Sequence, residues 1–94
     1  MSLRWPANDA AVGIWEDRVE GVWFNLARND GVGLVLCLAT REAIAERAAR
    51  DGRAESALQT FTRLRDEIAR IAASRFDDGQ IEPILIGKPD LLGG

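Results

Sequence analysis

The chain has 94 residues, of which 47% are hydrophobic and 29% are charged, and its formal net charge is −3. This size and balance fit one soluble globular domain and differ from those of a disordered chain. The acidic balance argues against sequence-independent DNA binding, and the complete lack of histidine excludes Ser-His-Asp and Cys-His catalysis and any histidine-ligated metal site.

The sequence offers no signal for a membrane or for export. The longest uncharged apolar run, residues 32–39, is far too short to span a bilayer. The first residues, MSLRWPAND, lack the apolar core of a secretory signal. Cys37 is the single cysteine, so the chain has no internal disulfide. We therefore expect a cytoplasmic protein with no membrane contact.

Short strands are expected at the start of the chain. Residues 3–5 form either an edge strand or a packed arm, which Pro6 ends. Residues 12–16 (VGIWE) alternate weakly and predict a strand. Residues 17–21 (DRVEG) are interpreted as a polar connection closed by glycine.

A β-hairpin is expected next, from strands at residues 21–27 (GVWFNLA) and 31–39 (GVGLVLCLA). A type I turn followed by Gly31 in a bulge gathers six large apolar side chains on one face. The pairs in this register are Leu26 with Leu34, Phe24 with Leu36 and Val22 with Leu38. A two-residue turn at Asp30-Gly31 would place Asn25 opposite Leu36 and gather fewer apolar side chains, so the first register is preferred.

Two helices follow the hairpin. Thr40 is a good N-cap for a helix over residues 41–50, whose thin buried side is Ala43, Ile44 and Ala48. Asp51 and Gly52 end it, with Gly52 in the left-handed position.

The second helix begins near residues 54–56 and runs to Phe76. Its apolar stripe is Leu58, Phe61, Leu64, Ile68, Ile71 and Ala72. Arg65 falls in the middle of this stripe. The exposed face carries Arg63, Glu67 and Arg70 at spacings that suit weak ion pairs.

A final strand is expected over residues 83–86, with Pro83 at its start because proline has no N–H to donate. Gly87, Pro89 and the terminal Gly93 and Gly94 are expected to end the ordered part, which leaves the last few residues flexible. The element order is therefore β-β-β(-β)-α-α-β. It predicts a single small α+β domain over residues 1–94, with an antiparallel β-meander of three to five strands and two helices packed on one face.

This pattern resembles the bacterial domain-of-unknown-function family 1488 (DUF1488) over nearly the whole chain. The resemblance rests on the strand-to-cap run at residues 35–40 (VLCLAT), on the spacing of Ala57, Leu58, Phe61, Arg65 and Ile68, and on the closing residues 84–86 with Asp90 and Leu91. It implies a small bacterial α+β protein without an established activity.

Arg65 is the sharpest candidate for a site. A guanidinium on an apolar helix face needs partners, because burying it unpaired is costly. The structural interpretation pairs it with a carboxylate such as Glu42, Glu82 or Asp90, or with backbone carbonyls. The functional interpretation makes it an anion-binding residue beneath a small cleft.

A second candidate is the face of the sheet that the helices leave uncovered. In the preferred register, Trp23 points to this face together with Val35 and Cys37, and Trp15 joins them. An open apolar face with tryptophan is typical of an association surface, here for a homodimer. The alternative is that the N-terminal segment or Leu91 and Leu92 fold over it.

The remaining residues do not predict chemistry. Cys37 is interpreted as packing, and Asp77-Asp78 as an ordinary turn. We expect no catalytic residues, no metal and no cofactor, and no nucleic-acid partner. The leading hypothesis is a non-enzymatic interaction or accessory domain that self-associates around Trp23. The alternatives are a small-molecule or anion-binding module using Arg65 and a transcriptional regulator.

Overall fold

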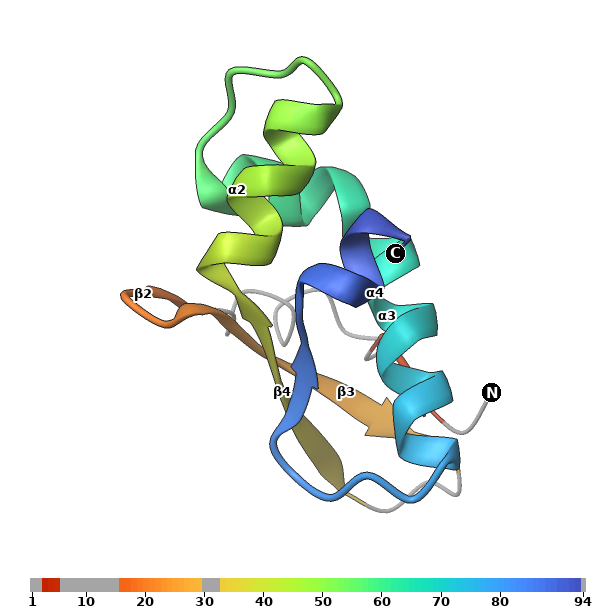
Figure 1. Ribbon diagram of the computed structural model, residues 1–94. Helices are drawn as coiled ribbons and strands as arrows, with labels where there is room; N and C mark the ends of the chain where they lie inside the picture. The colour runs from red at the N-terminus through yellow and green to blue at the C-terminus, as the bar shows by residue number, and fades with distance from the viewer. Residues whose placement is uncertain (1–2, 6–15, 30–32, 94) are drawn as a thin grey trace.

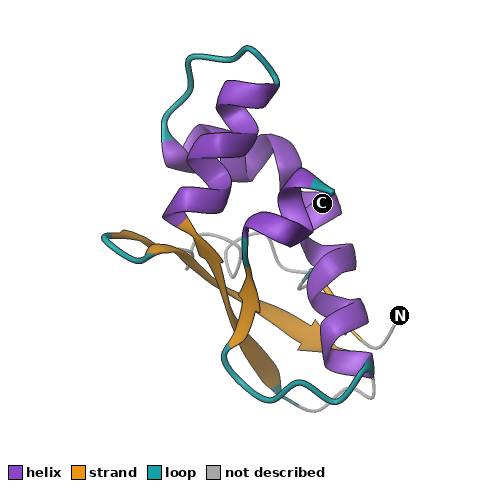
Figure 2. Cartoon of the chain, viewed as in Figure 1, coloured by secondary structure: helices purple, strands orange, loops and turns teal. Residues whose placement is uncertain are grey.

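The structure is a computed structural model that describes residues 3–5, 16–29 and 33–93. The described elements have the α+β composition that the sequence predicts (Figures 1 and 2). In chain order they are β1 (Leu3–Arg4), β2 (Glu16–Arg18), β3 (Gly21–Arg28), β4 (Leu34–Thr40), α2 (Arg41–Arg50), α3 (Ala57–Asp77), β5 (Ile84–Ile86) and α4 (Lys88–Leu92).

Strand β3 is the centre of a mixed sheet. It pairs antiparallel with β1 and β2 along one side and with β4 along the other. Strand β5 pairs with β4 and runs parallel to it. The prediction of a purely antiparallel meander is therefore wrong for the last strand. Helix α2 carries the chain away from the sheet and α3 returns beside it, so that β5 starts at the same end as β4 (Figure 1).

Of the two predicted N-terminal strands, the first is confirmed, and the second is described only at Glu16. Strand β1 lies at the sheet edge, as expected for residues 3–5. Residues 12–15 of the second predicted strand lie outside the described residues. Strand β2 extends through Asp17 and Arg18, which were interpreted as part of a connection, and only Val19 and Glu20 form the turn to β3. This segment is a strand because its backbone forms hydrogen bonds with β3. The polar residue types in its sequence do not indicate that pairing.

The register of the β3–β4 pair differs from the preferred prediction. Asn25 lies opposite Leu36, which is the arrangement that the apolar count disfavoured. The helix-facing pairs are Val22 with Ala39, Phe24 with Cys37 and Leu26 with Val35. The shift of one residue turns the leucines of β4 to the opposite face of the sheet.

Aromatic packing explains why the smaller residues of β4 face the helices. The rings of Phe24 on β3 and Phe61 on α3 have centroids 4.9 Å apart, and the Trp5 ring lies 5.5 Å from Phe24 and 6.0 Å from Phe61. These rings fill the layer between sheet and helix. Cys37 and Ala39 leave room for them, whereas leucines there would overfill the core.

Helix α2 agrees with the prediction at both ends. The Thr40 hydroxyl accepts a hydrogen bond from the Ala43 N–H at 3.3 Å, and Gly52 has a φ of +71°. The buried residues are Ala43, Ile44 and Ala48, as expected. Figure 1 shows α2 leaving the end of β4 and α3 running along the sheet. Ile44 of α2 and Phe61 of α3 belong to one core with the helix-facing residues of β3 and β4.

Helix α3 begins at Ala57, after the N-cap Ser56. The Ser56 side chain and Gln59 form a reciprocal capping box. The buried stripe is Thr60, Phe61, Leu64, Ile68, Ala69, Ala72 and Ala73. This stripe keeps Phe61, Leu64, Ile68 and Ala72 of the predicted one. It is slightly rotated, because Thr60, Ala69 and Ala73 are buried as well, while Leu58 is exposed and Ile71 is half-buried. Arg65 is also exposed.

A network of charged side chains joins α2 to α3. Arg47 donates to both carboxylate oxygens of Glu67, at 2.7 and 3.0 Å, and to Asp51 at 3.0 Å. Arg63 donates to Glu55 at 3.0 Å and to Asp51 at 3.1 Å. Arg63 and Glu67 are therefore half-buried and form ion pairs with residues outside α3. The sequence predicted instead that they belong to an exposed row of weak ion pairs along this helix.

Ordered structure continues beyond β5, contrary to the prediction. Lys88–Leu92 form the short helix α4, which ends at Gly93 in the left-handed conformation. Leu91 is completely buried in the core. The residues between Gly87 and Gly93 were expected to be flexible because glycine and proline are abundant there, but proline is well tolerated in the first turn of a helix.

Candidate functional site

The exposed face of the sheet carries a row of apolar side chains from three strands. The register places Trp23 opposite Leu38 and Leu38 beside Leu85 of β5. Trp23 is half-buried, Leu38 is buried, and Leu85 is 45% exposed. The same face of β4 presents Leu34 and Leu36, which are 49% and 37% exposed. We call Trp23, Leu34, Leu36, Leu38 and Leu85 the leucine face.

Hollows lie at both ends of the leucine face. One, of about 700 Å³, is lined by residues that include Leu38, Leu85 and Val19. The other, of about 390 Å³, lies at the Leu34 end of the sheet and is lined by Leu34, Ile81 and the helix-side residues Val35 and Phe76. Val19, in the first hollow, is 84% exposed. The apolar surface beside Leu38 and Leu85 therefore extends onto the turn between β2 and β3.

The three residues predicted to lie at an interface, Trp15, Trp23 and Val35, do not share one face of the described sheet. Trp23 lies on the exposed face of the sheet, as predicted. Val35 is 3% exposed and faces the helices, so its placement on the exposed face is wrong because the register is shifted. Trp15 lies outside the described residues. Leu34, Leu36 and Leu85 were missed, although the disfavoured register would have identified the two on β4.

Arg65 is not inside the apolar stripe. Its side chain is exposed, and its backbone carbonyl accepts a hydrogen bond from the Trp5 indole N–H at 3.2 Å. The three carboxylates considered as its partners have other contacts: Asp90 pairs with Arg75, Glu82 accepts from the Leu36 N–H, and Glu42 lies near Lys88. The spacing of Phe61, Leu64 and Ile68 forms a buried stripe that does not need residue 65, so this residue can be exposed.

Cys37 is a core residue. It is completely buried, and this burial, aided by the charge of Glu82, raises the pKa of its thiol to about 12. A thiol in this state is a poor nucleophile at neutral pH. The interpretation of Cys37 as packing agrees with this environment.

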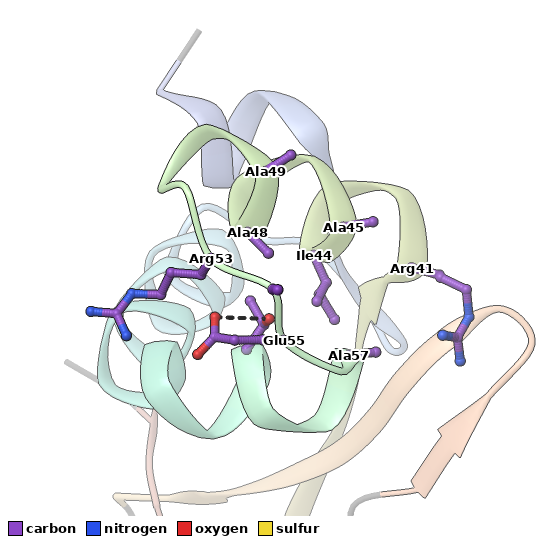
Figure 3. A pocket seen from close by; sticks show the side chains of 10 residues that line it. Arg41, Ile44, Ala45, Ala48, Ala49, Arg53, Glu55 and Ala57 are labelled. Atoms are coloured by element: carbon purple, nitrogen blue, oxygen red, sulfur yellow. Dashed lines mark hydrogen bonds between the residues drawn. The ribbon is translucent and has the colours of Figure 1, made fainter.

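A further groove, of about 570 Å³, lies between α2 and the start of α3 (Figure 3). Its floor is Ile44 with small side chains, and Figure 3 shows Arg41 and Arg53 at opposite sides. Glu55 at its edge accepts a hydrogen bond from the Thr60 hydroxyl at 3.2 Å and pairs with Arg63. A fourth hollow, beside Arg4 and Trp5, lies against α3. Arg65 lines none of the four hollows described here.

The described residues contain neither a candidate metal site nor a membrane-spanning helix. Histidine, cysteine, aspartate and glutamate side chains do not gather there in a group that could hold a metal ion. Among the described helices, none is long and apolar enough to cross a membrane.

Comparison with known proteins gives one match. The family model described as "Protein of unknown function (DUF1488)" matches residues 13–86. This range covers the exposed sheet face and the two long helices. No curated protein and no solved structure matches the chain.

Proposed function

Because the chain belongs to the DUF1488 family of proteins of unknown function, its role has to be inferred from its own surface, and we propose that it is a non-enzymatic interaction domain that forms a homodimer through the leucine face. The single observation that supports this proposal is the contiguous exposure of Leu34, Leu36 and Leu85 around Trp23. Scattered exposed leucines need no explanation, but a contiguous apolar patch on a sheet marks an association surface.

The sheet edges favour association through the face. As far as the described residues extend, the outer strands are two residues long in β1 and three residues long in β2 and β5. Pro83, directly before β5, has no N–H to offer a new strand. Very short edges of this kind protect a sheet against edge-to-edge pairing. The two sheets of the dimer would therefore stack about 10 Å apart, with leucines interdigitated.

A second copy is the partner that best fits this surface. The five residues of the leucine face are apolar, and the neighbouring groups are the uncharged Asn25 opposite Leu36 and the Glu82 carboxylate, which already accepts a hydrogen bond from the Leu36 N–H. Two copies can therefore bury the same apolar residues against each other. A two-fold arrangement uses one patch twice, which a single chain can provide without any other component.

The proposal is tested by substituting one leucine and one matched control. Leu36→Glu places a charge in the centre of the leucine face, whereas Leu58→Glu changes a leucine of equal exposure, 37%, on α3. Multi-angle light scattering should give a dimer for the wild type and for Leu58→Glu, and a monomer for Leu36→Glu. The loss should be at least about 2 kcal/mol of association free energy.

Two results would contradict the proposal. One is a wild-type protein that remains monomeric at the highest soluble concentration. The other is a Leu36→Glu variant that dimerises as strongly as Leu58→Glu. Circular dichroism of each variant should match the wild type, because both positions are on the surface.

The other candidate functions receive less support from the described surface. Anion binding through Arg65 would use a side chain that lines none of the four hollows. A transcriptional regulator would need a positive helix face for DNA, but Arg63 is already paired with Glu55 and Asp51.

A further inference from the structure

Helix α4 contributes little apolar surface to the core. Leu91 is its one buried residue, while Lys88 and Pro89 are exposed and Asp90 and Leu92 are half-buried. The ordering of a short helix costs conformational entropy, which one buried leucine offsets only in part. The other contacts of α4 are therefore important for keeping it closed.

The C-terminal end of α4 meets arginines from α2. Arg47 Nη1 donates to the Leu91 carbonyl at 2.9 Å, and Arg50 Nη1 donates to the Leu92 carbonyl at 2.8 Å. The last carbonyls of a helix have no intrahelical partner and carry partial negative charge, so cations bind them favourably. These two arginines recognise the end of a helix through its backbone and place no demand on its side chains.

Side-chain recognition comes from α3 and the core. Arg75 on α3 forms an ion pair with Asp90, and Leu91, the next residue, inserts into the core. The site therefore selects an acidic residue directly followed by a leucine. Asp90 also accepts a hydrogen bond from the Gly87 N–H at 2.9 Å, which helps the short helix to form.

The contacts at the start of α4 are weak. Lys88 Nζ lies 3.0 Å from Glu46 and 3.7 Å from Glu42, and the Lys88 and Glu46 side chains are 45% and 49% exposed. Exposed ion pairs contribute little and are screened by salt. Arg50 and Arg75 are similarly exposed, at 50% and 44%. The contacts of Lys88, Arg50 and Arg75 are thus open to solvent on the arginine or lysine side, whereas the Arg47 and Asp90 side chains are only 13% and 11% exposed.

Helix α4 is thus held by Arg47, Arg50 and Arg75 of α2 and α3 and by the insertion of Leu91 into the core. From this combination we infer that α2 and α3 form a binding site for a short helical segment with an acidic residue before a leucine, and that α4 occupies this site until a partner protein displaces it. The site is distinct from the leucine face, and its occupation does not depend on dimerisation.

Displacement requires that α4 opens without global unfolding. Hydrogen exchange of the full chain measures this directly. The amides of residues 90–93 should exchange at least tenfold faster than those of β4, and faster still when sodium chloride is raised. Equal exchange of α4 and β4 at every salt concentration would overturn the inference.

Binding is tested with a defined probe, the acetylated and amidated peptide GKPDLLG, which reproduces residues 87–93. Its affinity for a full-length Leu91→Ala chain should be at least tenfold higher than for the wild type, because the variant's own α4 competes poorly. The control peptide GKPDALG should bind that variant at least tenfold more weakly. Leu58→Ala, a change away from α4, should leave the wild-type affinity unchanged.

A second variant covers the case in which Leu91→Ala fails to fold. Asp90→Asn keeps the leucine and weakens only the pairing with Arg75 and the helix cap, and it should raise the affinity for GKPDLLG about threefold. A folded Leu91→Ala chain that does not bind the peptide would overturn the inference. If Leu91→Ala does not fold, an Asp90→Asn chain with wild-type affinity would overturn it.

Discussion

At the residue scale, the aromatic contact between Phe24 and Phe61 is the centre of the core. Both side chains are essentially inaccessible, and their rings contact each other and Trp5. Phe61→Ala should lower the free energy of unfolding by about 3–5 kcal/mol, because it removes buried apolar surface and leaves a cavity. Urea denaturation measures this loss. A loss below about 1 kcal/mol would show that the layer between sheet and α3 is not packed as described.

A second residue-scale prediction concerns Cys37. Burial raises the pKa of its thiol to about 12, so that very little thiolate is present near neutral pH. Reaction with a disulfide reagent at pH 8 should be at least about a thousandfold slower in the folded protein than in guanidinium chloride. Similar rates in the two conditions would contradict the placement of Cys37 between the sheet and the helices.

At the element scale, the charge network between α2 and α3 predicts a response to acid. The hydrogen bond from Arg47 holds the pKa of Glu67 below its ordinary value of 4.5, and the hydrogen bond from Arg63 does the same for Glu55. Burial acts to raise the pKa of Asp51, but hydrogen bonds from Arg63 and Arg47 outweigh it.

These lowered pKa values give the sign of the pH dependence. A carboxylate whose folded pKa is lowered stabilises the fold above its unfolded pKa, and this stabilisation is lost as pH falls through the folded pKa. The melting temperature should therefore decline as pH falls below about 4.5. Glu67→Gln should flatten part of this decline, whereas Asp66→Asn, on the exposed side of α3, should not. Identical pH profiles for the wild type and Glu67→Gln would contradict the network.

The elements differ in how well the sequence predicts them. The ends of α2 and the start of α3 depend on Thr40, Gly52 and Ser56, whose effects act within a few residues, and these ends are predicted well. The register of β3 and β4 depends on what covers each face. Both faces of β4 are apolar, so counting apolar pairs favoured the wrong register.

The C-terminal helix illustrates the same limit. Nothing within residues 88–92 alone predicts a helix, because five residues are too few to be stable without tertiary contacts. Arg47 and Arg50, which hold its end, are about forty residues away in sequence. Likewise, Arg65 was assigned to the core by its spacing, although its neighbours can pack without it.

At the scale of the whole molecule, α3 lies along one face of the sheet, and the opposite face of the described strands carries exposed leucines beside the buried Leu38. Helix α3 lies along the first face, where Phe24 and Phe61 meet, and the exposed side carries Leu34, Leu36 and Leu85. The prediction of an interface near Trp23 stays a prediction, and the register places Trp23 on the side of the sheet opposite Phe24. The predicted interface wrongly included Val35, because a shift of one residue in the register moves every side chain of β4 to the other face of the sheet.

The most direct test of the proposed dimer is an isotope-filtered NMR experiment on a mixture of labelled and unlabelled protein, which detects contacts between copies alone. We predict intermolecular contacts from the methyl groups of Leu34, Leu36 and Leu85, and between these methyl groups and the Trp23 ring. Intermolecular contacts that arise from α2 or α3 instead, or their absence at the highest soluble concentration, would contradict the leucine face as the site of self-association.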